Sequence, residues 1–155
     1  MQSGPTGLTG AGETGATGPG GSTVYLGTDQ SIGNLDFLGL GTSSASFIRN
    51  TIVVPQDSTI TGLVFNIRDH TLGTGIVASA EIFVSSDCGF DPPVATGIIA
   101  AVTGPNSDAS PNCCAFAVGD FNVEKCDLIS VRVTTGGGAF ANGVAATILF
   151  STTTP

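Results

Sequence analysis

Four cysteines, Cys88, Cys113, Cys114 and Cys126, are the side chains of this sequence with the most readily named chemistry. They lack the paired Cys-x-x-Cys spacing of a structural zinc site, and His70 is the only histidine, so we predict no metal site. In a strand, neighbouring cysteines 113 and 114 point to opposite faces and reach different partners. The pairing is then Cys88–Cys113 with Cys114–Cys126, or Cys88–Cys114 with Cys113–Cys126. Interchain disulfides and free buried thiols are open alternatives.

The other reactive side chains form no catalytic pattern. Catalysis needs a nucleophile beside a base, or two carboxylates in different environments. His70 is interpreted as a loop residue, and Asp87, Asp91 and Asp108 flank loops without the ligand spacing of an EF-hand. The glycine-rich segment 134–143 is followed by no Lys-Ser/Thr helix start, which favours a hairpin loop over a phosphate site. We predict neither an enzyme nor a cofactor.

The segments that must position these residues are predicted to be short strands. Charged residues make up 10% of the chain and lysine occurs once, so the exposed faces of long helices lack their usual residues. Hydroxyl and β-branched residues favour strands instead. About seven to ten strands separated by turn signals predict a β-sandwich or jelly roll. The predicted strands cover 23–26, 35–41, 46–59 with a break at 55–57, 59–69, 77–86, 94–104, a short strand from 114 to a turn at Gly119-Asp120, 128–133 and 143–152.

The last predicted strand is apolar on both faces. Ile148 and Phe150 lie on one face, whereas Ala145 and Leu149 lie on the other. A strand in a monomeric sandwich usually has one apolar and one polar face. The second apolar face therefore predicts a partner chain against the outside of the sheet.

A glycine period of three occupies the start of the chain. Glycine stands at positions 4, 7 and 10, and then, after one missing residue, at 12, 15, 18 and 21. Only glycine fits at the crowded axis of a collagen triple helix, and a flexible linker has no reason to hold a three-residue register. We predict a collagen-like stub over residues 1–22, a β-sandwich trimerisation domain over 23–155, and an assembly of three chains.

The charge balance excludes several partners. The net charge is −8, and the four basic residues, Arg49, Arg68, Lys125 and Arg132, are scattered along the chain. Nucleic acid and anionic membrane surfaces require clustered basic residues, so we predict binding to neither. No apolar stretch is long enough to cross a bilayer, and we expect no secretory leader in the chain as written.

Three stretches together resemble the collagen-like exosporium glycoproteins of Bacillus spores, of the BclA/BclB type. They are "GPTGLTGAGETGATGPG" (4–20), "VVPQDSTITGLVFNI" (53–67) and "DLISVRVTTGGGAFANGVAATI" (127–148). The chain departs from that family in its four cysteines and in the insert "TGPNSDASPNCC" (103–114). The resemblance implies a jelly-roll head, like those of the complement C1q and tumour-necrosis-factor type, that forms a homotrimer and nucleates the triple helix.

The resemblance also implies a place and a role. The chain would be a structural head on the spore surface, in an exosporium hair or at an appendage tip, beside other coat or appendage proteins. Its alternative role is a receptor- or glycan-binding adhesin head, on a spore or a phage fibre. Contacts would then come from the loops at 68–76, 87–93, 104–112 and 134–143.

Threonines in the collagen-like stub are candidates for modification. Family members carry O-linked sugars on threonines of the triplets, and the third triplet position here is occupied by Thr6, Thr9, Thr14 and Thr17. The alternative is that threonine takes the place of hydroxyproline.

Overall fold

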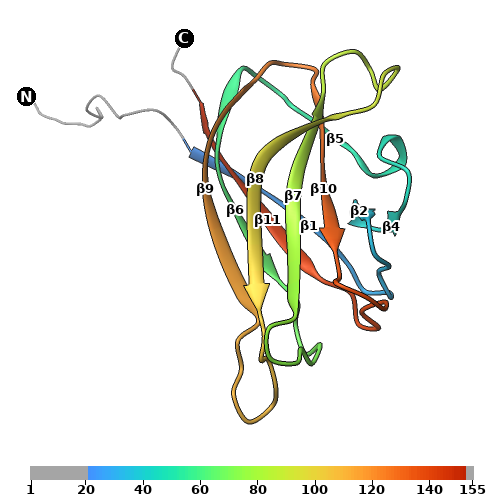
Figure 1. The fold of residues 1–155 in the computed structure, drawn as a ribbon. Helices are drawn as coiled ribbons and strands as arrows, with labels where there is room; N and C mark the ends of the chain where they lie inside the picture. The colour runs from blue at the N-terminus through green and yellow to red at the C-terminus, as the bar shows by residue number, and fades with distance from the viewer. Residues whose placement is uncertain (1–20, 153–155) are drawn as a thin grey trace, which may run out of the picture.

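The computed structural model describes residues 21–152 and contains two β-sheets packed face to face (Figure 1). The predicted all-β sandwich is therefore confirmed. The first strand begins at Gly21, and the stub residues before it, including Thr6, Thr9, Thr14 and Thr17, lie outside the described residues. No helix of the described part is long and apolar enough to cross a membrane.

Each sheet is assembled from strands that are far apart in the sequence. The first sheet has the order β3 (Leu40–Gly41), β1 (Gly21–Thr28), β11 (Ala145–Thr152), β6 (Ser58–Asn66) and β9 (Cys114–Val123). The second has the order β4 (Ser43–Ser44), β2 (Asp36–Leu38), β10 (Leu128–Thr134), β7 (Val77–Ser85) and β8 (Val94–Thr103). Strand β5 (Ile52–Val53) pairs with β10, and η1 (Ile48–Asn50) is a single 3-10 turn.

The antiparallel pairs are nested in the manner of a jelly roll. The innermost pair is β7 with β8, followed outward by β6 with β9, β2 with β10, and β1 with β11. This arrangement is one long hairpin wrapped around a barrel-like core, which is the jelly-roll topology. The first and last described strands are consequently neighbours.

The core follows the alternation of the sequence. The alternate residues Ile129, Val131 and Val133 of β10 have no exposed surface, and neither have Phe65 and Ile148. Burial of these side chains, each worth about 1.5–3 kcal/mol, is the main force that holds the sheets together. In β6 the inward set is shifted by a register change between Ile60 and Gly62, so Ile60 rather than Thr61 is buried with Leu63 and Phe65.

Two predicted boundaries are wrong. The turn at Gly119-Asp120 is absent, because β9 continues through both residues to Val123. The predicted strand at 46–59 contains η1, and its preceding residue Phe47 folds over the second sheet. The break at 55–57 is confirmed: it separates β5 from β6.

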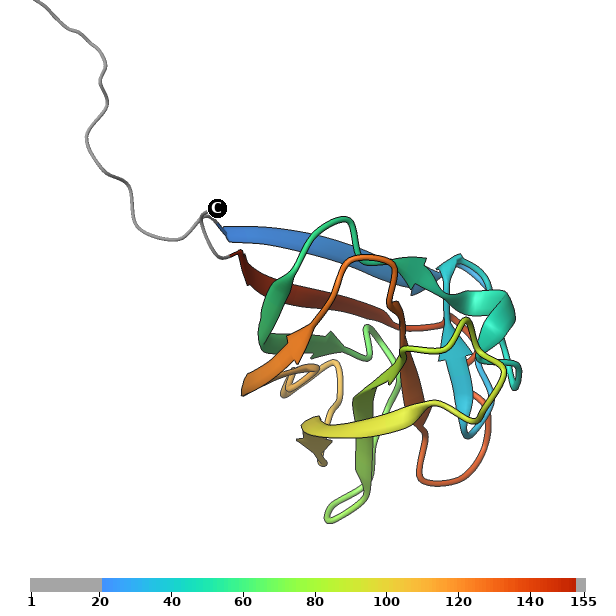
Figure 2. The same ribbon diagram turned by 90° about the horizontal axis from the view of Figure 1, so that it is seen from above.

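The sandwich has two distinct ends, which we call the base and the tip (Figures 1 and 2). The base contains both ends of the described chain, because Gly21 pairs with Ser151. It also holds the β5–β6, β7–β8 and β9–β10 connections. The tip is formed by the connections at 29–35, 67–76, 104–113 and 135–144.

Candidate interaction face and tip pocket

The outward side of the first sheet, here called the outer face, carries no charged residue in its two central rows. Cross-strand pairing fixes these rows. One row runs Tyr25, Thr147, Val64 and Phe116, and the next runs Thr23, Leu149, Gly62 and Val118. Strand residues two apart share a face, so the seven side chains and Gly62 form one continuous surface.

Large apolar side chains of the outer face are open to solvent. Val118 is 78% exposed, Tyr25 69% and Phe116 56%. At the centre, a Cβ added to Gly62 would lie 3.0 Å from Cε1 of Phe116 and 3.2 Å from Cδ1 of Leu149. The absence of a side chain at Gly62 therefore lets Phe116 and Leu149 lie flat across the sheet. The predicted second apolar face of the last strand belongs to this surface.

The second sheet, by contrast, covers its own outward aromatic residues. Phe37 makes edge-to-face contacts with Phe47 and Phe83, each with ring centroids 5.5 Å apart. The guanidinium of Arg132 lies 4.5 Å from the centroid of Phe83. The loop that carries Phe47 thus acts as an internal cover, and these aromatic rings are not available to a partner.

Arg68 joins three connections at the tip. Its Nη1 donates to the Thr28 carbonyl at 2.6 Å and to the Asn142 carbonyl at 2.7 Å. The neighbouring Asp69 accepts hydrogen bonds from Nδ2 of Asn142 on both oxygens, at 3.0 Å each. Charge-assisted bonds of this kind are the stronger ones in proteins, so the tip loops are held to one another.

His70 has a structural contact at the tip rather than a catalytic partner. Its ring stacks on Phe140, with centroids 3.6 Å apart and planes at 21°. Buried Asn106 donates from Nδ2 to the His70 carbonyl at 2.7 Å. The loop position predicted for this histidine is confirmed, and its ring packs between two connections.

A pocket of about 460 Å³, lined by several polar residues, opens at the tip. It lies between the connection after β6 and the connection that contains the 103–114 insert. Its lining residues are Arg68, Asp69, Thr71, Asn106, Ser107, Asp108, Pro111 and Cys113. The volume is within the range of small-ligand sites.

Three of the four loops predicted to carry contacts come together at the tip. Loops 68–76 and 104–112 are joined through paired backbone hydrogen bonds of 3.0 Å between Leu72 and Asn106. Loop 134–143 joins them through Asn142. Loop 87–93 is different: it follows β7, whose end at Ser85 pairs with Leu128, and so it lies at the base.

The cysteines are free thiols, and neither predicted intrachain pairing fits their positions. Cys113 and Cys114 lie at the tip end of β9, whereas Cys126 follows its base end. Nine residue steps of strand separate the ends by about 30 Å. A disulfide needs Cα atoms within about 7 Å. Cys88 also lies in a base loop. Asn66 donates from Nδ2 to Sγ of Cys113 at 3.4 Å.

The aspartates of the β7–β8 loop organise that loop. The hydrogen bond from Ser85 Oγ to Asp87 Oδ1, at 2.9 Å, is the main cause of a lowered Asp87 pKa, together with backbone donation from Asp91 at 3.1 Å. In the described part of the chain, no group of three or more His, Cys, Asp or Glu side chains is placed to hold a metal ion.

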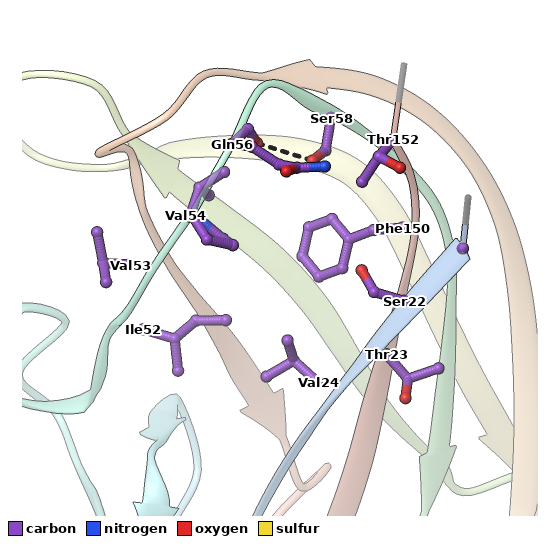
Figure 3. Close-up of a pocket in the computed structure, with 12 residues that line it drawn as sticks. Ser22, Thr23, Val24, Ile52, Val53, Val54, Gln56, Ser58, Phe150 and Thr152 are labelled. Atoms are coloured by element: carbon purple, nitrogen blue, oxygen red, sulfur yellow. Dashed lines mark hydrogen bonds between the residues drawn. The ribbon is translucent and has the colours of Figure 1, made fainter. Parts of the chain in front are cut away.

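A second cavity, of about 400 Å³, lies at the base beside β1 (Figure 3). The side chains of Val24, Ile52, Val54 and Phe150 form its apolar part. Polar residues surround them, and Ser58 Oγ donates to the Gln56 carbonyl at 2.8 Å. The cavity borders the position at which the chain enters β1.

Sequence reasoning found the loops at the tip but not the residues that join them. Arg68 and Asn142 are 74 positions apart, and neither belongs to a recognisable motif. The Asn142-Gly143 pair signals a turn, but a turn signal does not tell which loop its side chain reaches.

No protein-family model matches the chain, and no curated protein matches it. A solved structure to which it is similar is that of Eiger TNF from S. frugiperda. The sequence identity is 10% and the TM-score is 0.48, with 88% of this chain and 94% of that chain covered. The jelly-roll topology described above stands on the strand pairing alone.

Proposed function

We propose that the chain is a structural, homotrimeric head of a collagen-like protein, which trimerises through the outer face and nucleates a triple-helical stalk. The observation that carries the proposal is the uncharged pair of central rows on the outer face, with Tyr25, Phe116 and Val118 exposed, on the sheet that contains the first strand. Contiguous exposed apolar patches of this kind mark interaction surfaces.

The occupant of the outer face is inferred from the glycine period. A collagen helix requires three chains wound around one axis. The last glycine of the period, Gly21, is also the first residue of β1. Three copies of Gly21 must then lie near that axis, which brings the outer side of each β1 strand toward the other copies. The partner that covers the outer face is thus a second and a third copy of this chain.

Joining three chains at one end also explains how a short stalk begins to wind. It raises the effective concentration of the three collagen segments and fixes their register. Both ends of the described chain, 21 and 152, lie at the base, opposite the tip. The head would therefore point its tip away from the stalk.

The location at the spore surface, in an exosporium hair or an appendage tip, is proposed from the family resemblance of residues 4–20, 53–67 and 127–148. A hydroxyl-rich head of net charge −8 suits a surface layer, because heads of like charge repel one another.

Light scattering on the full chain and on a chain that begins at Gly21 tests the trimer. The molar mass of each in solution should be about three times that of its monomer, which is 15.3 kDa for the full chain. A monomeric shorter chain would mean that the stub, not the head, holds the trimer together, and would overturn the proposed interface.

A pair of surface variants tests the face itself. Val118→Asp places a charge on the outer face and should yield monomers. Val53→Asp adds the same charge at a site 60% exposed on the second sheet and should leave the trimer intact. If both remain trimers, the interface lies elsewhere.

A second candidate function, an adhesin head, is favoured by one observation. Loops 68–76, 104–112 and 134–143 meet at the tip, which is the end away from the proposed stalk. Binding residues are often placed on loops held by a rigid scaffold. Selective binding of a glycan or a receptor by the full chain, absent after changes at the tip, would support this role.

A further inference from the structure

We propose that the tip pocket is a saccharide site, selective for neutral or amino-bearing sugars over anionic ones. That the pocket faces away from a stalk follows only from the proposed function. The pocket itself is formed by residues of one chain and does not depend on the trimer. It lies between the connection after β6 and the insert at 103–114.

The floor of the pocket is fixed before any ligand arrives. Asn106 is 4% exposed and lines the pocket. Its Nδ2 donates to the His70 carbonyl at 2.7 Å, and its Oδ1 accepts from the Asn112 backbone at 2.7 Å. The backbone N–H and carbonyl of Asn106 are both hydrogen-bonded to the backbone of Leu72, at 3.0 Å each. A preorganised floor lowers the entropy cost of binding a ligand.

The wall of the pocket offers unused hydrogen-bonding groups. The side chains of Thr71 and Asp108 make no hydrogen bond to any residue within 21–152. A carboxylate accepts two hydroxyl donors, and a threonine hydroxyl both donates and accepts. Vicinal hydroxyls of a sugar ring match this set, and the Pro111 ring adds an apolar surface for the C–H face of the sugar.

Charge decides which sugars fit. Nη1 of Arg68 is already committed to two carbonyls, and Asp69 is held by Asn142. Asp108 remains without a cation, and the three charged groups sum to −1 in a chain of net charge −8. A carboxylated or sulfated sugar would meet like charge, whereas an amino group would meet Asp108 favourably.

The test measures binding of the full chain to glucose, galactose, mannose, glucosamine and glucuronate by NMR saturation transfer and titration. At least one neutral or amino sugar should bind, and glucuronate should not. Thr71→Ala and Asp108→Ala should each weaken binding at least tenfold. Glu124→Ala removes an exposed carboxylate at the base and should leave affinity unchanged.

The outcomes separate this inference from the trimer. The three substituted residues are exposed, so thermal melts should show unchanged folding. Absence of binding by all sugars, preference for glucuronate, or binding unaffected by Asp108→Ala would each overturn the saccharide site. Light scattering on the same samples reports the trimer independently: a monomer that still binds leaves the site standing, and a trimer that binds nothing overturns the site alone.

Discussion

Gly104, at the tip, packs the start of the β8–β9 connection against the loop after β6. A Cβ at this position would lie within van der Waals overlap of the Gly73 carbonyl oxygen, a backbone atom that cannot rotate away. We expect Gly104→Ala to destabilise the fold by about 2 kcal/mol, which lowers the unfolding temperature by roughly 5–10 °C. Calorimetry checks this. Gly137→Ala is the control, because no atom lies within 4 Å of its added Cβ.

Ionisation of Asp87 makes the stability of the β7–β8 loop depend on pH. The bond from Ser85 lowers its pKa in the folded state, so the ionised form contributes stability. This contribution is complete above the ordinary Asp pKa of about 4 and is lost as pH falls through the lowered value. Asp87→Asn should therefore lower the melting temperature at pH 7 more than at pH 2. An equal effect at both pH values would show that ionisation of Asp87 plays no part.

Gly119 shows why a residue type alone misled the prediction of a turn. A Cβ there would lie 2.4 Å from Cδ1 of Ile98, on the facing strand β8. The glycine makes room for a core side chain instead of bending the chain. Glycine in a strand serves close packing as well as turns, and only the partner strand distinguishes the two.

At the scale of elements, Arg68 couples the β1–β2, β6–β7 and β10–β11 connections through its two carbonyl acceptors. Arg68→Ala should raise amide hydrogen exchange at 28–30 and 140–144 at least tenfold, without a comparable change in β7. Arg68→Lys should rescue only part of the protection, because a lysine lacks the planar fork of donors. Unchanged exchange in both loops would mean that other contacts hold the tip.

Strand positions were largely predictable because the core alternates with period two. Ile129, Val131 and Val133 face inward as the pattern indicates. The 46–51 segment was not predictable in this way: its β-branched and aromatic residues favour a strand, but Phe47 covers Phe37 and Phe83 from outside the sheet. The tip pocket could not be predicted from the sequence either, because it depends on a strand order that brings residues 68–71 beside residues 106–113.

At the scale of the whole molecule, the sequence suggested both a trimer and stabilising disulfides. The four cysteines are free, so the proposed trimer does not depend on intrachain disulfides. Every bond of the two predicted intrachain pairings would have to cross most of the length of β9. We therefore expect the unfolding temperature of the full chain to be the same with and without reductant. A drop of several degrees on reduction would point to disulfides between chains.

The proposed trimer makes stability depend on concentration. A chain that folds and associates together gains stability by mass action, so its unfolding temperature should rise as protein concentration is raised tenfold. Val118→Asp, which should stay monomeric, should unfold at a temperature independent of concentration. Calorimetry over a concentration series distinguishes the two, and a flat response in the unchanged chain would argue against a coupled trimer.

The pairing of Gly21 with Ser151 has a practical consequence for display. Cargo appended after the last strand would emerge beside the entry of the chain, at the base and so on the side of the proposed stalk. The three-glycine loop (136–138) in the connection that crosses from β10 in the second sheet to β11 in the first offers the opposite position, since a Cβ at Gly137 or Gly138 would meet open space. An epitope inserted there would stand at the tip, the end away from the proposed stalk, where an antibody could reach it.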